Sequence, residues 1–210
     1  MTKSGGTLTR QRVLEAALQL IDQEGLEGFS MRKLGAMLGV EAMSLYNHVE
    51  SKRALFDGVI ELLITQDPYP EQPHATPREE LWAFAHAFRD ILRAHPHVLP
   101  LVATSPLRTP ATLVTLDHLL ATVQRAQITG VEAIYALQCL VGFIVGHTWI
   151  EMGTQSMAGL EPGPNGPMVW QQFPAERYPT LHALLPEIAQ WNPDHEFDFG
   201  LQALFQSLFE

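Results

Sequence analysis

The sequence predicts an all-α protein: an N-terminal head of three helices with helix-turn-helix spacing, followed by a C-terminal helical bundle. Three observations support this fold class. Apolar residues recur at helical spacing along most of the chain. No segment sustains the alternation with a period of two that is typical of a half-buried strand. Finally, the stretch 34–46 has small residues and apolar anchors at the spacing that two closely packed helices need.

Four helices are expected before residue 66, and the first, second and fourth begin after a hydroxyl side chain that can cap them. The second helix has a glycine directly after it, and the first has one two residues beyond its end, as is common at helix C-termini. The expected spans are 10–23, 31–38, 41–49 and about 52–65, with Thr9, Ser30 and Ser51 as caps and Gly25 and Gly39 as stops.

Residues 67–77 are rich in proline and polar side chains, so they form the natural linker. We therefore place a head domain at 1–65 and a second domain at 66–210. Helices are expected in the second domain at about 77–94, 98–103, 110–126, 130–154 and 197–209. The proline- and glycine-rich stretch 157–180 is expected to be a long loop.

The charge distribution bears on whether the head can approach nucleic acid. The whole chain has a net charge of −10, which disfavours contact with phosphates. Residues 1–53, however, carry seven basic and six acidic side chains, a balance of +1, so the remainder carries −11. The acidity thus belongs to the part of the chain that need not touch DNA.

Other features of the sequence indicate a cytoplasmic protein. Cys139 is the only cysteine, which excludes an internal disulfide and favours a buried thiol in a reducing compartment. The first nine residues lack the apolar core of a signal peptide. Val131–Ile150 is the most apolar stretch, but polar and small residues interrupt it, so no membrane span is expected.

The stretch 34–46 meets the requirements of a helix-turn-helix. Gly35 supplies a small residue where the two helices touch, and Gly39 tolerates positive φ at the turn. Val40, Leu45 and Val49 are apolar and can lock the second helix onto the first. The exposed face of this helix could then enter a major groove. An ordinary αα-hairpin would show the same spacing.

Three segments around this stretch resemble the TetR family of transcriptional regulators. They read RQRVLEAA at 10–17, GLEGFSMRKL at 25–34 and SLYNHVESKRALF at 44–56. The resemblance covers 9–65 closely. More weakly, FDFGLQALF at 197–205 is similar to the last helix of the tetracycline-repressor branch. The resemblance implies a DNA-binding head fused to a domain that senses a small molecule and forms a homodimer.

The resemblance also implies roles for particular residues of the head. Arg32 should reach a base or a phosphate, Ala42 and Met43 can contact thymine methyl groups, and Ser44 can read a base directly. Met31 stands where the family often has a small polar residue. The expected contacts with double-stranded operator DNA are Met31, Arg32, Lys33, Ala42, Met43, Ser44, Tyr46, Asn47, His48 and Lys52. Partial burial of Met43 and a surface role for His48 are the alternatives.

In the second domain, the resemblance implies that the long helix and the last helix pair with a second copy as a four-helix bundle. The stripe Val131, Ile134, Leu137, Val141 and Val145 and the set Leu201, Leu204, Phe205, Leu208 and Phe209 would supply the contact. Packing within one subunit is the alternative. The expected lining of an effector pocket is Trp82, Phe84, Phe88, Leu92, Val102, Leu119, Phe143, His147, Trp149 and Trp170, although most such residues serve only as core.

The tetracycline repressors hold a magnesium–drug chelate with histidines and an asparagine. By ungapped alignment those places here are Pro68, Phe84 and Val102, so the sequence predicts an apolar or aromatic effector. No cofactor, metal site or catalytic motif is expected, because His95 with His97 and His86 with Asp90 each fall short of a closed ligand set. An all-helical enzyme and a protein-binding adaptor are the rival functions.

Overall fold

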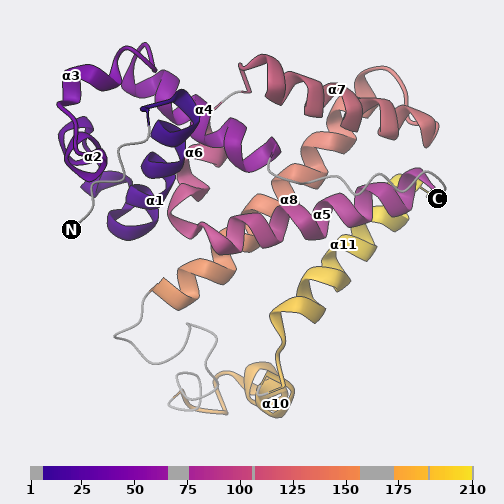
Figure 1. The fold of residues 1–210 in the computed structure, drawn as a ribbon. Helices are drawn as coiled ribbons and strands as arrows, with labels where there is room; N and C mark the ends of the chain where they lie inside the picture. The colour runs from indigo at the N-terminus through magenta and orange to yellow at the C-terminus, as the bar shows by residue number, and fades with distance from the viewer. Residues whose placement is uncertain (1–6, 66–75, 106, 157–172, 189, 210) are drawn as a thin grey trace.

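The structure is a computed structural model that describes residues 7–65, 76–105, 107–156, 173–188 and 190–209. Within these ranges every regular element is a helix, as the sequence predicts. The three helices expected in the head and the helix that follows them form the head together, and the others form an elongated body beside it (Figure 1). Their bounds are α1 Arg10–Gly28, α2 Met31–Leu38, α3 Ala42–Leu45, α4 Lys52–Thr65, α5 Pro77–Ala94, the 3-10 turn η1 Pro96–Val98, α6 Leu99–Thr104, α7 Pro110–Arg125, α8 Val131–Ser156, α10 Pro179–Ile188 and α11 Pro193–Phe209.

Most helices begin where the sequence predicts because local hydrogen bonds fix their ends. The hydroxyls of Thr9, Ser30 and Ser51 accept bonds from the backbone amides of Arg12, Lys33 and Ala54, respectively. Thr76 and Glu79 form a complete capping box at the start of α5. The predicted caps of α1, α2 and α4 are therefore confirmed.

Three predicted elements differ from the structure. Gly25 does not end the first helix but kinks it, with φ 70° and ψ 173°, and α1 continues to Gly28. The third helix spans only four residues, because the chain turns again at 46–48 instead of continuing to Val49. The part of the expected loop that is described contains the start of α10, and the last helix begins at Pro193 rather than near Phe197.

Two apolar clusters divide the buried residues. One joins α1, α2, α3 and α4 around Val13, Leu34 and Leu45, and Val98 of η1 completes it. The other lies in the body, where α8 packs against α5, α7 and α11 (Figure 1). Val102 of α6 packs against both clusters, so η1 and α6 connect the head with the body.

The contact between η1 and α1 is polar as well as apolar. His95 Nδ1 lies 2.8 Å from an Asp22 carboxylate oxygen. His97 Nδ1 lies 3.2 Å from the carbonyl oxygen of Ile21 and 3.0 Å from that of Asp22. These two histidines fasten η1 to the second half of α1.

The hydropathy of α8 corrects one expectation. By length and composition alone, Val131–Met152 is sufficiently long and apolar to cross a membrane, whereas the polar and small residues within it predict no such stretch. Its composition reflects two apolar faces. One packs into the body through residues such as Leu140 and Ile144, and the other is exposed at Ile134, Tyr135 and Trp149.

Candidate DNA-binding face and effector region

The turn between α2 and α3 depends on two glycines. Gly39 adopts φ 71° and ψ 29°, a left-handed conformation that glycine enters without steric penalty. The amide of Val40 donates to the carbonyl of Gly35 over 2.9 Å. A Cβ on Gly35 would lie 2.8 Å from the carbonyl oxygen of Val40 and 3.1 Å from the amide nitrogen of Ala42. The helices can cross this closely only because residue 35 has no side chain, which confirms the predicted role of both glycines.

Helix α3 presents its tip to solvent because two anchors beside it are buried. Leu45 and Val49 lie in the apolar cluster of the head. On the opposite side, Met43 is 73% exposed and Tyr46 is 42% exposed. Asn47 is exposed as well, whereas Ala42, Ser44 and His48 are half-buried. The alternative of a partly buried Met43 is therefore wrong.

Helix α2 contributes two exposed side chains, one of which is already paired within the head, and one half-buried side chain. Arg32 is exposed. Lys33 is held by the carboxylate of Glu24 and by the carbonyl of Gly28, so its ammonium already has partners within the head. Met31 is half-buried against the apolar cluster. Of these three predicted DNA contacts, Arg32 is the residue most available for contact with DNA.

Lys52 is positioned by two aromatic rings at the start of α4. Its ammonium lies 5.3 Å from the ring centroid of Phe29 and 5.3 Å from that of Phe56. It also lies 3.5 Å from the carbonyl oxygen of Phe29, to which it donates. Because the faces of aromatic rings attract cations, the rings of Phe29 and Phe56 hold the Lys52 ammonium in place beside α2. Sequence reasoning named Lys52 but not the rings that fix it.

Most of the predicted effector residues gather in the body. Phe84, Phe88, Leu92 and Leu119 are buried in its core, and Trp82, Val102 and Phe143 pack against them. The rings of Phe84 and Phe88 stack with centroids 5.6 Å apart. Trp149 lies on the exposed side of α8, and Trp170 and Pro68 fall outside the described residues. Seven of the ten predicted residues thus share one apolar cluster.

His147 stands at one end of this cluster without a hydrogen-bond partner for either ring nitrogen among the described residues. Nδ1 lies 3.9 Å from Glu151 Oε2, and Nε2 lies 3.7 Å from Glu196 Oε2. Its ring meets that of Phe197 edge-on. Burial lowers the pKa of His147, and Arg89 lowers it further, while the two carboxylates act in the opposite direction.

A buried ion-pair network, which sequence reasoning missed, borders His147. Arg89 is 2% exposed and donates to Glu151 through Nε and Nη2, over 3.2 and 3.0 Å. Its Nη1 lies 2.9 Å from Asp194. Arg93 binds both carboxylates, over 3.3 and 3.0 Å. Burial alone would raise the pKa of Asp194, but the two guanidinium groups outweigh it and lower that pKa.

The network ties α5, α8 and α11 together at the end of the aromatic cluster. Removing one member would leave a buried charge without its partner, which is strongly destabilising. The only sequence signal was the presence of charged residues on otherwise apolar helix faces, and their partners lie 62 residues or more away.

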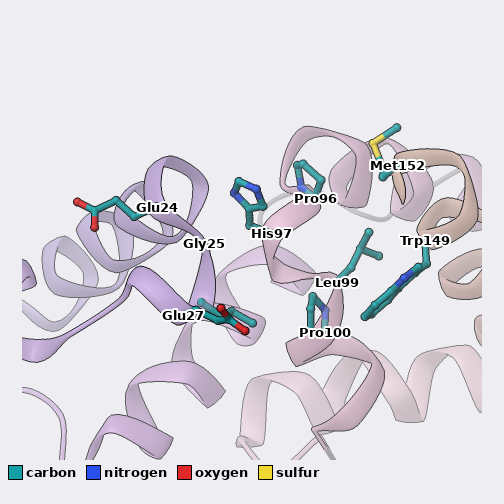
Figure 2. Close-up of a pocket in the computed structure, with 10 residues that line it drawn as sticks. Glu24, Gly25, Glu27, Pro96, His97, Leu99, Pro100, Trp149 and Met152 are labelled. Carbon is teal, nitrogen blue, oxygen red and sulfur yellow. The ribbon is translucent and has the colours of Figure 1, made fainter. Parts of the chain in front are cut away.

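A groove of about 640 Å³ lies between the head and the body (Figure 2). It shares only Trp149 with the predicted effector residues. Its lining comes from the end of α1, from η1 and α6, and from α8, and comprises Glu24, Gly25, Leu26, Glu27, Pro96, His97, Leu99, Pro100, Trp149 and Met152. Among the described residues, no group of three or more side chains has the geometry to hold a metal ion.

The short α3 with its exposed tip, set on buried anchors and flanked by Arg32 and Lys52, defines a helix-turn-helix DNA-binding protein. Comparison with known families agrees. Residues 13–59 match the model of the bacterial regulatory proteins of the tetR family, and residues 69–208 match that of the tetracyclin repressor-like C-terminal domain. The chain belongs to the TetR family and is a ligand-responsive DNA-binding transcriptional regulator.

Two curated relatives cover nearly the whole chain. The HTH-type transcriptional repressor DrrR1 of Streptomyces coeruleorubidus is 30% identical over 96% of this chain and 77% of its own length. The class A tetracycline repressor from transposon 1721 of Escherichia coli is 30% identical over 93% of this chain and 88% of its own. Both are named as repressors rather than as enzymes.

Solved structures share the fold. A possible TetR family regulator from Streptomyces coelicolor A3(2) superposes with a TM-score of 0.79, at 28% identity, over 95% of this chain and 98% of its own. Apo ActR from Streptomyces coelicolor gives a TM-score of 0.82 at 24% identity, over 98% and 97% of the two chains. The all-helical head and body are thus those of the family.

Proposed function

We propose that this protein is a homodimeric repressor in which 1–65 binds a palindromic operator and 66–210 senses a largely apolar small molecule. The observation that carries the DNA-binding part is the tip of α3. Its anchors are buried while Met43 and Tyr46 project into solvent. A short helix presented in this way can enter the major groove, with Arg32 and Lys52 beside it to contact phosphates.

Within the proposed DNA-binding face, some residues would contact bases and others would contact the DNA backbone. Ala42 and Met43 can contact thymine methyl groups, whereas Arg32 and Ser44 can form hydrogen bonds with base edges. Tyr46, Asn47, His48 and Lys52 would contact the backbone, and Met31 would support the start of α2. Lys33 can contact a phosphate only if it exchanges or shares its contacts with Glu24 and Gly28.

The dimer is supported by the exposed part of the predicted α8 stripe and by residues beside it, but not by the buried part of that stripe. Leu137, Leu201 and Phe205 are buried within the chain, so they cannot carry a contact between subunits. Val131 and Ile134 of the predicted stripe are exposed, and so is Tyr135 beside them. A Cβ added to Gly142 or Gly146 would meet nothing within 4 Å, so a partner helix can approach closely there. Phe199 on α11 is 78% exposed and extends this face.

The apolar effector is supported by the body's aromatic cluster. Phe84 and Phe88 stack in a region whose described buried residues are mostly apolar. The buried polar residues of the body are Thr112, Thr122, Thr148 and the Arg89–Glu151 ion pair, and His147 lies beside that pair. A polar drug placed there would lose about 1–3 kcal/mol for each buried group left without a partner. An aromatic compound would gain roughly 25 cal/mol per Å² of apolar surface removed from water.

DNA binding is tested by a gel shift with the promoter DNA that the protein regulates, repeated at several salt concentrations. A retarded complex that weakens steeply with added salt is expected, because phosphate contacts release counterions. Absence of any complex with DNA would favour the adaptor or the enzyme instead.

The effector is tested by titrating compounds into the protein–DNA complex. We expect apolar aromatic compounds to release the DNA and Phe88→Ala to weaken that response. Tetracycline with magnesium serves as the comparison, because the chain resembles the tetracycline repressors. Release by magnesium–tetracycline at micromolar concentration would contradict the proposed chemistry.

A further inference from the structure

The groove between the head and the body has the size and the walls of a small-molecule site. Its volume of about 640 Å³ lies within the range of roughly 300–1,000 Å³ that is usual for such sites. Leu99, Pro100 and Met152 give it apolar walls, and the flat ring of Trp149 closes one side (Figure 2). The groove borders the body's apolar cluster, because Leu99 belongs to that cluster and Met152 packs against it, whereas Trp149 lies on the exposed face of α8.

The charged groups of the groove have one sign. Two of its ten lining residues are glutamates, and none is lysine or arginine. Glu24 is already paired with Lys33 and points away from the cavity in Figure 2. Glu27 lines the groove from the end of α1 (Figure 2), and among the described residues no cationic side chain pairs with it. Its carboxylate therefore favours a cation in the space in front of it.

One further group favours the same charge. Trp149 is 45% exposed, and the face of an indole ring is the strongest aromatic partner for a cation. His97 also lines the groove, and its Nδ1 contacts two backbone carbonyls of α1. A carboxylate and a ring face thus line an apolar space.

We propose that this groove is a second ligand site, distinct from the effector region in the body, and that it takes a flat, apolar organic cation. The apolar part of the ligand would pack against Leu99, Pro100 and Met152. Its cationic centre would lie between Glu27 and Trp149. Because the walls come from α1 on one side and from α6 and α8 on the other, an occupant bridges the head and the body.

The test uses a matched pair of probes on the full-length protein without DNA. Naphthylmethyl-trimethylammonium is the cation, and neopentylnaphthalene is its neutral isostere, in which carbon replaces nitrogen. Isothermal titration calorimetry measures both affinities. We expect the cation to bind about 5- to 30-fold more tightly than the isostere, as a cation–π contact together with one carboxylate would provide. Equal affinities, or no binding of the cation, would overturn the proposal.

Variants separate this site from other acidic or apolar places on the protein. Glu27→Gln should reduce the affinity for the cation severalfold and leave that for the isostere unchanged. Trp149→Leu should reduce the affinity for the cation more than the affinity for the isostere. Two controls at exposed side chains far from the groove lining should change neither value: Glu187→Gln on α10 and Val114→Ala on α7. Unchanged cation binding in Glu27→Gln and Trp149→Leu would place the ligand elsewhere on the protein and contradict the proposal.

Discussion

At the scale of single residues, Lys52 offers the sharpest test of the DNA-binding face. Lys52→Met keeps an unbranched side chain between Phe29 and Phe56 but removes the charge. We expect binding to weaken on all DNA sequences and the slope of log affinity against log salt to fall by about one. Fluorescence anisotropy at several salt concentrations measures both quantities.

A control for this variant is Arg53→Met, one residue further along α4, where the side chain is exposed but contacts neither ring. An unchanged salt slope in Lys52→Met, or an equal change in both variants, would show that Lys52 does not contact a phosphate.

The half-buried imidazole of His147 makes stability depend on pH. Its pKa is lowered in the folded state, chiefly by burial and also by Arg89, although Glu196 and Glu151 oppose the shift. The unfolded chain therefore takes up the proton first as the pH falls below about 6.5, and the free energy of unfolding decreases from there down through the folded-state pKa. Above that pH the contribution of this group is constant.

Urea unfolding at about pH 7.5 and about pH 5.5 tests this expectation. His147→Gln cannot titrate, so it should lose less stability between the two pH values than the unchanged protein does. If both proteins lost the same amount, His147 would not be the group that titrates.

Several residues of the site could be read from the sequence, and others could not. The exposure of Met43 and Tyr46 follows from the spacing of the buried anchors within one short segment. The contact of Lys33 with Glu24 and the pairing of Arg89 with Glu151 depend instead on how separate helices pack. Helical periodicity places a residue on a face but does not say which face of another helix it meets.

At the scale of elements, the turn between α2 and α3 requires positive φ at Gly39. A Cβ there would meet nothing within 4 Å, so any penalty of substitution comes from the backbone alone. We expect Gly39→Val to destabilise the protein by about 1–3 kcal/mol. Chemical denaturation measures the change.

Gly39→Asn is the matched control, because asparagine enters the left-handed region more readily than a β-branched residue does. It should destabilise the protein less than Gly39→Val. The reverse order, or normal stability of Gly39→Val, would mean that this conformation does not limit the fold.

The starts of helices were predicted from the sequence where a capping residue or a proline gave a strong local signal. Caps and prolines located the starts of α1, α2, α4, α5 and α7. Helix α10 was missed, although Leu181, Leu184, Leu185 and Ile188 have helical spacing, because the expected loop was extended through the prolines that precede it. The third helix was predicted too long, since apolar spacing alone does not distinguish helix from the tight turns at 46–48.

At the scale of the whole molecule, the proposed dimer predicts an effect of charge on the exposed face of α8. Ile134→Glu places a carboxylate among exposed apolar residues and should shift the protein from dimer to monomer. Val114→Glu is the control, because Val114 is also exposed, at 70%, but lies on α7. Light scattering after size-exclusion chromatography gives both masses. A dimeric Ile134→Glu variant would contradict the use of this face.

The central claim is that the tip of α3 and the start of α2 together read a specific DNA sequence. The most direct measurement is selection of bound fragments from a pool of random double-stranded DNA, performed with the unchanged protein and with the double variant Arg32→Ala, Tyr46→Ala. The unchanged protein should enrich a palindrome whose half-sites fit two heads, and the variant should enrich none or bind far more weakly. Failure of the unchanged protein to enrich any sequence, or recovery of the same palindrome at the same affinity by the variant, would contradict the claim.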